Sequence, residues 1–129
     1  MSTYRTLLLS ATLAISLGFA SVFAAAQLER RTSNAGGVAI AVQPLDLAPG
    51  AKSWDFEVTM NTHVTPLEQD LTKVSTLVDA AGARQAPTAW KGDPPGGHHR
   101  KGVLQFAPLA GSPQYVELQI RDVGAPEVR

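Results

Sequence analysis

Apolar residues at every second position are the strongest signal in this chain of 129 residues. Residues 53–61 alternate cleanly and place four apolar side chains on one side: Trp54, Phe56, Val58 and Met60. The residues between them are polar or charged, which is typical of a strand with one buried and one wet face in an antiparallel sheet. A helix would keep Trp54 beside Val58 but turn Phe56 to the far side. The pattern therefore predicts a strand.

The same alternation predicts further short strands along the chain. They lie at residues 37–42, 74–79, 102–106 and 115–121. In residues 74–79 the inward face carries either Val74, Thr76 and Val78, or Leu77. Residues 67–72 fit either one helical turn or an extended crossing between strands.

Prolines and glycines separate these strands. Pro44 is expected to end the first strand, and Pro87 restricts residues 84–90 to an edge strand or a strand start. Gly82 follows residues 79–81 in a predicted turn, where glycine supplies the positive φ that such turns often need.

No segment with helical periodicity occurs after residue 26. Six or seven short strands with Pro/Gly turns in one small domain indicate an antiparallel, immunoglobulin-like β-sandwich. Its predicted core faces come from three strands: Trp54, Phe56, Val58, Leu104, Phe106, Leu118 and Ile120.

The first 26 residues have the three parts of a secretory signal peptide. A short polar start carries Arg5, an apolar run extends over residues 7–23, and small residues Ala24–Ala26 precede a polar segment. We expect cleavage after Ala26, or alternatively after Ala24. The apolar run is shorter than the roughly 20 residues that span a bilayer, and an arginine pair follows it, so a stable membrane anchor is not expected. The pattern predicts a periplasmic or secreted protein.

The remaining chain is about one small domain long. We expect residues 27–36 to be a flexible leader and residues 37–129 to be the β-sandwich domain. The whole chain has 11 basic and 11 acidic residues, so it lacks the basic excess of a nucleic-acid-binding protein. It has no cysteine, which excludes disulfides, thiolate metal sites and a lipoprotein anchor.

The most unusual stretch is residues 90–106, WKGDPPGGHHRKGVLQF. We interpret it first as a structural corner that carries the chain from one sheet to the other. Stiff prolines and permissive glycines suit such a bend, while Arg100 and Lys101 are expected to face water. The corner comprises Trp90, Gly92, Pro94, Pro95, Gly96, Gly97 and Arg100.

A metal site is the alternative interpretation of this stretch. His98 and His99 follow two glycines, so both imidazoles could be aimed at one point, and His63 follows a predicted core strand. Three imidazoles, with Asp70 or Glu68 as an oxygen ligand, would suit copper or zinc.

Enzymatic activity is not expected. No glycine-flanked serine is paired with a histidine, and no carboxylate pair beyond Glu68 and Asp70 is apparent. The expected function is therefore a non-enzymatic binding or interaction domain that uses the Pro94–Arg100 end. Its partner would be an envelope protein or a small ligand, and the alternative is periplasmic copper or zinc binding.

Several motifs resemble a family of exported bacterial immunoglobulin-like proteins of unassigned activity. They are N-T-H at Asn61–His63, D-L at Asp70–Leu71, W-x-G at Trp90–Gly92, P-P-G-G-H-H-R-x-G-x-L-x-F at Pro94–Phe106 and V-E-L-Q-I-R-D-V-G at Val116–Gly124. The resemblance covers most of the mature chain and implies an immunoglobulin-like fold. It also places His63 and the His98–His99 pair in one signature, which favours their meeting in space. Similar domains continue into a final aromatic-containing strand, so the resemblance implies an incomplete last sheet edge or a truncated chain after Arg129.

Overall fold

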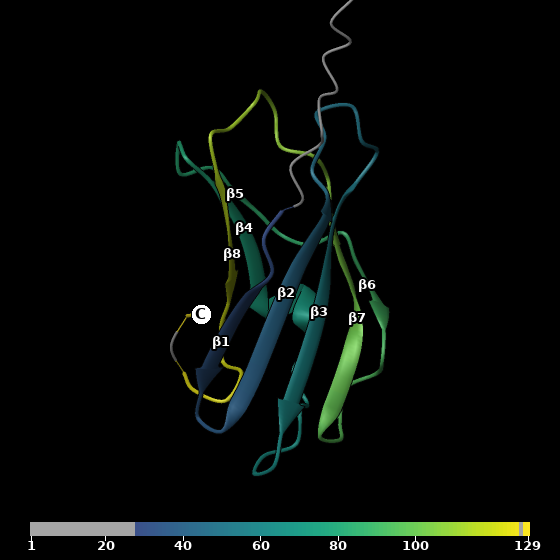
Figure 1. Ribbon diagram of the computed structural model, residues 1–129, viewed down its shortest axis with the longest axis vertical. Coiled ribbons are helices and arrows are strands. Elements are labelled where there is room, and N and C mark those ends of the chain that lie inside the picture. Colours follow the sequence, from purple (N-terminus) through teal and green to yellow (C-terminus); the bar gives the residue numbers. More distant parts are fainter. Residues whose placement is uncertain (1–27, 127) are drawn as a thin grey trace, which may run out of the picture.

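The computed structural model describes residues 28–126 and 128–129 and shows two antiparallel sheets packed face to face (Figure 1). The predicted signal peptide, residues 1–26, lies outside this part of the chain. Among the described residues, no helix has both the length and the apolar character needed to cross a membrane.

The larger sheet has five strands in the order β1-β2-β3-β7-β6. Their bounds are Arg31–Ala35, Val38–Asp46, Trp54–Thr62, His99–Phe106 and Ala89–Gly92. The smaller sheet has the order β5-β4-β8, with bounds Arg84–Gln85, Ser75–Asp79 and Val116–Ile120. One short helix, α1 (Leu71–Val74), precedes β4.

The strand order is that of the immunoglobulin fold. β2, β3, β7 and β6 correspond to strands A, B, E and D, and β5, β4 and β8 correspond to C′, C and F. β1 forms a hairpin with β2 and extends the larger sheet beyond strand A. The prediction of an immunoglobulin-like sandwich is confirmed, with eight strands in the described residues where six or seven were expected.

The predicted core lies between the sheets. All four alternating residues of β3 are buried, as are Leu104, Phe106 and Ile120, while Leu118 packs against the core from its margin. Phe56 and Phe106 meet edge to face with ring centroids 5.7 Å apart, a favourable aromatic arrangement. In β4 the buried residues are Ser75 and Leu77, so of the two alternatives for that strand the one with Leu77 inward is confirmed.

Two sequence expectations about the first strands are wrong. Pro44 does not end the first strand, because β2 continues to Asp46 through a register shift between Pro44 and Asp46. β1 pairs with β2 only as far as Val42, so Pro44 lies where one edge of β2 is unpaired and a missing N–H is tolerated. The flexible leader is also wrong for residues 31–35, which form β1.

The segment between β3 and β4 crosses from the larger to the smaller sheet. It buries Leu67 and Leu71, each 1% exposed, and ends in α1. Residues 67–72 therefore combine an extended crossing with the start of one helical turn.

Candidate binding cleft and the histidine corner

The structural corner that bears His98 and His99, called the histidine corner below, connects two strands of the same sheet. β6 and β7 are antiparallel neighbours, so the expectation that this bend carries the chain between the sheets is wrong. Instead, the corner holds the crossing segment. Leu67 donates its N–H to Gly97 O at 2.9 Å, and Gly96 donates to Leu67 O at 2.8 Å. Both glycines have positive φ (112° at Gly96 and 71° at Gly97), which explains why glycine occupies the corner.

Arg100 is buried, contrary to the expectation that it faces water. It is 2% exposed and is the largest fully buried side chain among the described residues. Its Nη1 donates to Leu67 O at 3.1 Å and Gln69 O at 2.7 Å, and the guanidinium lies 5.6 Å from the Trp90 ring centroid. Burial lowers the pKa of Arg100, while Asp70 and Asp93 oppose this shift. Arg100 thus ties the crossing segment to the larger sheet.

The other corner residues shape the β6–β7 hairpin. Trp90 Nε1 donates to Asp93 O at 2.8 Å, and the Asp93 carboxylate accepts the Lys101 N–H at 2.9 Å. A Cβ on Gly102 would lie 2.7 Å from the Trp90 ring, so the indole covers the backbone there. Pro94 and Pro95 are exposed at the turn. Packing and hydrogen bonds therefore account for Trp90, Asp93, Arg100 and Gly102 in this stretch.

The two histidine-bearing segments lie at the same end of the sandwich. Thr62 donates its N–H to His98 O at 2.9 Å, and Asn61 pairs with His99 across β3 and β7. His63, His98 and His99 are all exposed. His99 Nδ1 lies 2.5 Å from Asn61 Oδ1, so with Nδ1 as donor only Nε2 is open to a ligand.

Asp70 does not join the histidines. It is the N-cap of α1, and its carboxylate accepts the Thr72 N–H at 2.9 Å and the Thr72 hydroxyl at 2.6 Å. These hydrogen bonds lower the pKa of Asp70, mainly through the Thr72 side chain. No group of three histidine, cysteine or acidic residues that could hold a metal ion occurs in residues 28–126 and 128–129.

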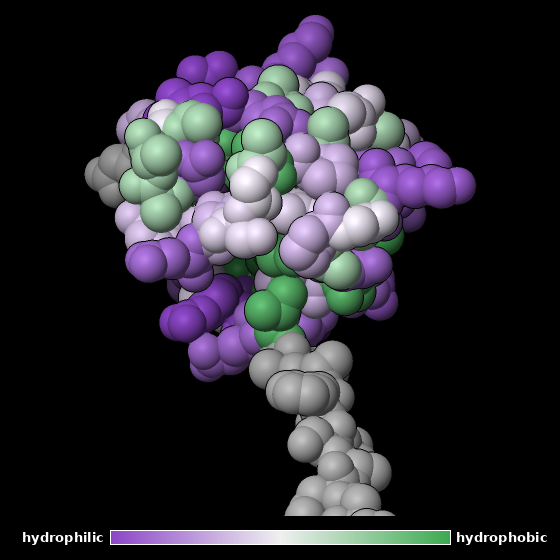
Figure 2. All heavy atoms as spheres, turned by 90° about the horizontal axis from the view of Figure 1, so that it is seen from above, coloured by the Kyte–Doolittle hydropathy of each residue, from purple (hydrophilic) through white to green (hydrophobic). Residues whose placement is uncertain are grey.

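A cleft on the opposite flank of the sandwich was not foreseen from the sequence. It lies between β1 and β8, has a volume of about 650 Å³ and reaches inward to core residues Ile40, Phe56 and Ile120. The loops at residues 47–49 and 111–115 form its upper mouth, where Tyr115 is 60% exposed. Figure 2 looks down on this end of the molecule, where strongly hydrophobic residues reach the surface among hydrophilic ones.

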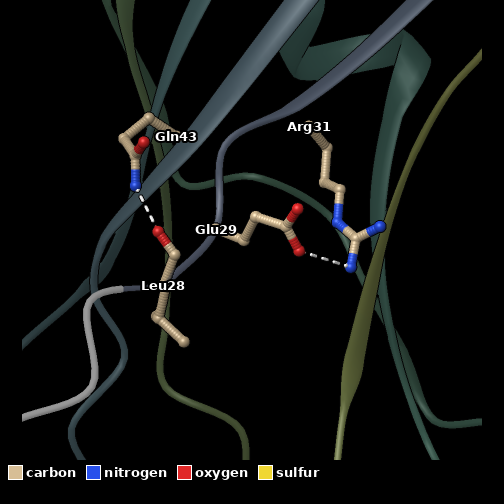
Figure 3. A network of polar contacts seen from close by, with 4 residues as sticks. All are labelled: Leu28, Glu29, Arg31 and Gln43. Carbon is tan, nitrogen blue, oxygen red and sulfur yellow. Dashed lines mark hydrogen bonds and ion pairs between the residues drawn. The ribbon is translucent and has the colours of Figure 1, made fainter.

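The first described residues flank the mouth of the cleft. Gln43 of β2 donates its side-chain N–H to Leu28 O at 2.7 Å, which fixes the chain leading into β1 (Figure 3). Glu29 and Arg31 form an exposed ion pair at 3.0 Å on the same rim. Leu28 itself is 41% exposed and lines the cleft.

Arg129 closes the lower end of the cleft. Its side chain donates to Ser33 O at 2.6 Å and to Val38 O at 2.8 Å, and so joins the smaller sheet to the β1–β2 hairpin. Its main chain exchanges two hydrogen bonds with Ile120 of β8, at 2.8 and 2.9 Å. In the part of the chain that the structure describes, β1 and β8 are both edge strands, and the sandwich is open between them above this point.

Sequence reasoning missed the cleft because it depends on which strands lie at the sheet edges. The available signal was the clean alternation of residues 116–120, which requires an apolar partner surface on the inner side. Comparison with protein-family models, with curated proteins and with solved structures finds no match to this chain.

Proposed function

We propose that this protein is an exported, non-enzymatic binding domain whose ligand site is the cleft between β1 and β8. The observation that carries the proposal is the apolar cleft of about 650 Å³, which falls within the usual size range of ligand sites. Export is supported by the signal-like sequence of residues 1–26.

The cleft is favoured over the Pro94–Arg100 corner, where the sequence placed the binding surface. At the corner the main chain of Gly96 and Gly97 is bonded to Leu67, and Arg100 is buried. In contrast, the cleft presents half-buried apolar side chains such as Val42, Val116 and Leu118 beside an open mouth.

Titration of the purified protein with the hydrophobic dye anilinonaphthalene sulfonate tests this proposal. Dye emission should rise on binding, and Leu118→Gln should weaken binding because it places an amide in the apolar cleft. Gln119→Ala is the matched control on the outer face of the same strand, at a position that does not line the cleft, and should bind as the wild type does. Thermal unfolding verifies that both variants are folded. Absence of dye binding, or equal binding by both variants, would refute the cleft as the ligand site.

A copper or zinc site through His63, His98 and His99 is the second candidate. The observation in its favour is the Thr62–His98 hydrogen bond, which brings the two histidine segments to one end of the sandwich. Titration with Cu(II) and Zn(II) should show binding that His63→Ala and His98→Ala each weaken. Equal weak binding by the wild type and both variants would eliminate the metal site.

A further inference from the structure

Three loops gather at one end of the sandwich, the upper end in Figure 1. Residues 47–53 connect β2 to β3, residues 80–83 connect β4 to β5, and residues 107–115 connect β7 to β8. The antiparallel pairing of β3 with β7 and of β4 with β8 brings the strand ends that bear these loops to one end of each sheet. We call this end, together with the adjoining residues 28–31 and 45–46, the loop end.

The loop end is rich in small apolar residues and poor in charge. The three loops read LAPGAKS, AAGA and APLAGSPQY, and Lys52 is the only charged residue in them. Beside them Leu45 is 52% exposed, and Tyr115 is 60% exposed. Seen from above, apolar and weakly polar residues fill much of the middle of this face, and strongly hydrophilic residues lie around it (Figure 2). An exposed apolar surface with a polar rim is typical of a contact site.

The loops also project from the body of the domain. Each contains one glycine, and a Cβ built at any of the three would meet no atom within 4 Å: Gly50, Gly82 and Gly111. The loop end therefore has room to contact a surface above it without a change in the packing of the core.

The acidic side chains of the loop end already have partners in the domain. Asp46 accepts a main-chain N–H of the first loop at 2.9 Å. Asp79, at the start of the second loop, accepts two main-chain N–H groups, each at 2.9 Å. Glu29 forms its ion pair with Arg31. These carboxylates are thus held by local contacts.

Two cations at the loop end have no such partner. Lys52 and Arg30 are exposed, and neither forms an ion pair with a residue of the described ranges 28–126 and 128–129. Bonded carboxylates beside unpaired cations give this end an attraction for anions. Its charge is therefore complementary to that of an anionic surface.

An anionic lipid surface matches this combination better than a protein does. Leu45 and Tyr115 come from different sheets, whereas a protein interface is centred on a packed cluster of large side chains. A fluid bilayer accommodates separate apolar side chains, and a tyrosine ring with its hydroxyl suits the level of the headgroups. Lysine and arginine at the same level attract anionic headgroups.

We propose that the loop end docks on an anionic lipid surface. Leu45 and Tyr115 enter the headgroup region, and Lys52 and Arg30 lie beside lipid phosphates. Export across a membrane, as proposed above, brings the domain beside such a surface. The inference goes beyond the proposed function and does not require a ligand in the cleft, because Leu45, Lys52 and Arg30 do not line it.

A fluorescent probe at single positions tests the inference. The chain has no cysteine, so one introduced cysteine carries a nitrobenzoxadiazole dye at a chosen site. Leu45→Cys and Tyr115→Cys report on the loop end. Val64→Cys is the matched control, because Val64 is 67% exposed and follows β3 at the opposite end. Vesicles of phosphatidylcholine and phosphatidylglycerol should raise and blue-shift the emission at the loop end and leave the control unchanged.

Lysine variants of the Leu45→Cys protein test the role of charge. Lys52→Gln should shift the midpoint of the vesicle titration at least about threefold toward higher lipid concentration. Lys91→Gln, at an exposed position of β6, is the matched control and should titrate as the parent does. Vesicles of phosphatidylcholine alone should give a weaker response that neither variant alters. Both substitutions are on the surface, and thermal unfolding verifies that the variants are folded.

The outcomes also distinguish a lipid from a protein partner. An equal response at the loop end and at Val64, no response at any position, or equal shifts for the two lysine variants would overturn the inference. A response of the loop-end probes to rising protein concentration without vesicles would assign this end to a second copy and overturn it too. Failure of anilinonaphthalene sulfonate to bind would refute the cleft as the ligand site but would not affect the vesicle result.

Discussion

Gly92 and Gly102 pair across β6 and β7 so closely that neither position has room for a side chain. A Cβ on Gly92 would lie 2.4 Å from Gly102 Cα, and one on Gly102 would lie 2.7 Å from both Gly92 Cα and the Trp90 ring. Gly102→Ala should therefore lower the free energy of unfolding by about 1–3 kcal/mol, because backbone and indole must both move. Urea denaturation measures the loss.

Gly50→Ala is the matched control for this prediction. A Cβ at Gly50 meets no atom within 4 Å, so its stability should stay within about 0.5 kcal/mol of the wild type. Equal stability of both variants would contradict this prediction, because it would show that β6 and β7 can move apart without lowering the free energy of unfolding.

Arg100→Met should destabilise the protein by about 1–3 kcal/mol. The substitution removes the donor to Gln69 O and the cation above Trp90, so the crossing segment loses its attachment to the larger sheet. Urea denaturation gives the stability, and limited proteolysis should show faster cleavage within residues 63–70. Lys101→Met, at the exposed neighbouring position, should change neither measurement appreciably. Equal results for the two variants would contradict the structural role of Arg100.

Acid stability should depend in part on Asp70. Hydrogen bonds from Thr72 hold the pKa of Asp70 in the folded protein below its ordinary value of 3.8. Because the folded-state pKa is depressed, this contribution is present above pH 3.8 and is lost as the pH falls through the lower folded-state pKa. Asp70→Asn keeps an oxygen acceptor at the N-cap but removes the titration. Thermal unfolding midpoints between pH 5 and about pH 2 should therefore decline less steeply in this variant, and identical slopes would contradict the prediction.

Arg129→Ala should lower stability by about 1–3 kcal/mol and loosen the lower end of the cleft. The side chain donates four hydrogen bonds, at 2.6 to 3.1 Å, to Ser33, Val38 and Val123. Hydrogen exchange should increase in β1 and at Ile120, and urea denaturation should show the stability loss. Arg31→Ala, which removes only an exposed ion pair, serves as control and should remain near wild-type stability.

Most of the fold could be predicted because alternation determines which face of a strand is buried. The residues of β3 and β8 carry this pattern without interruption, and their inward residues were identified correctly. β1 was missed because an exposed, polar edge strand buries almost nothing and so leaves no periodic signal. Pro44 was wrongly expected to end the first strand. A proline interrupts a strand only where a neighbouring strand needs an N–H donor at that position, and the sequence does not show which strand edges are paired.

The sequence contained a signal that Arg100 faces inward, but the charge of its side chain was given more weight. Counting back by twos from Phe106 through Leu104 and Gly102 reaches Arg100, which therefore shares their inward face. Its charge favoured an exposed position instead, because arginine is seldom buried without partners. Those partners are main-chain carbonyls of residues 67–69, whose position follows only from the three-dimensional fold.

The candidate site was less accessible to sequence reasoning. The sequence left open whether the segments of His63 and His98 meet, and only the family resemblance favoured it. The hydrogen bond from Thr62 to His98 O brings these two segments to one end of the sandwich. It gave Asp70 a possible ligand role, although local hydrogen bonds to Thr72 occupy that carboxylate. The cleft lies between β1 and β8, which begin at Arg31 and Val116, and no local sequence pattern shows how strands so distant along the chain are placed.

The hydrogen bond from Arg129 to Ser33 O spans 96 positions of the chain. Its formation requires closure of nearly the whole domain into a loop, and such distant contacts are slow to form. A nascent polypeptide cannot make this contact before residue 129 has been synthesised. This seam between the two sheets consequently closes only after the β2–β3 hairpin and the β6–β7 hairpin have been synthesised and have had time to assemble.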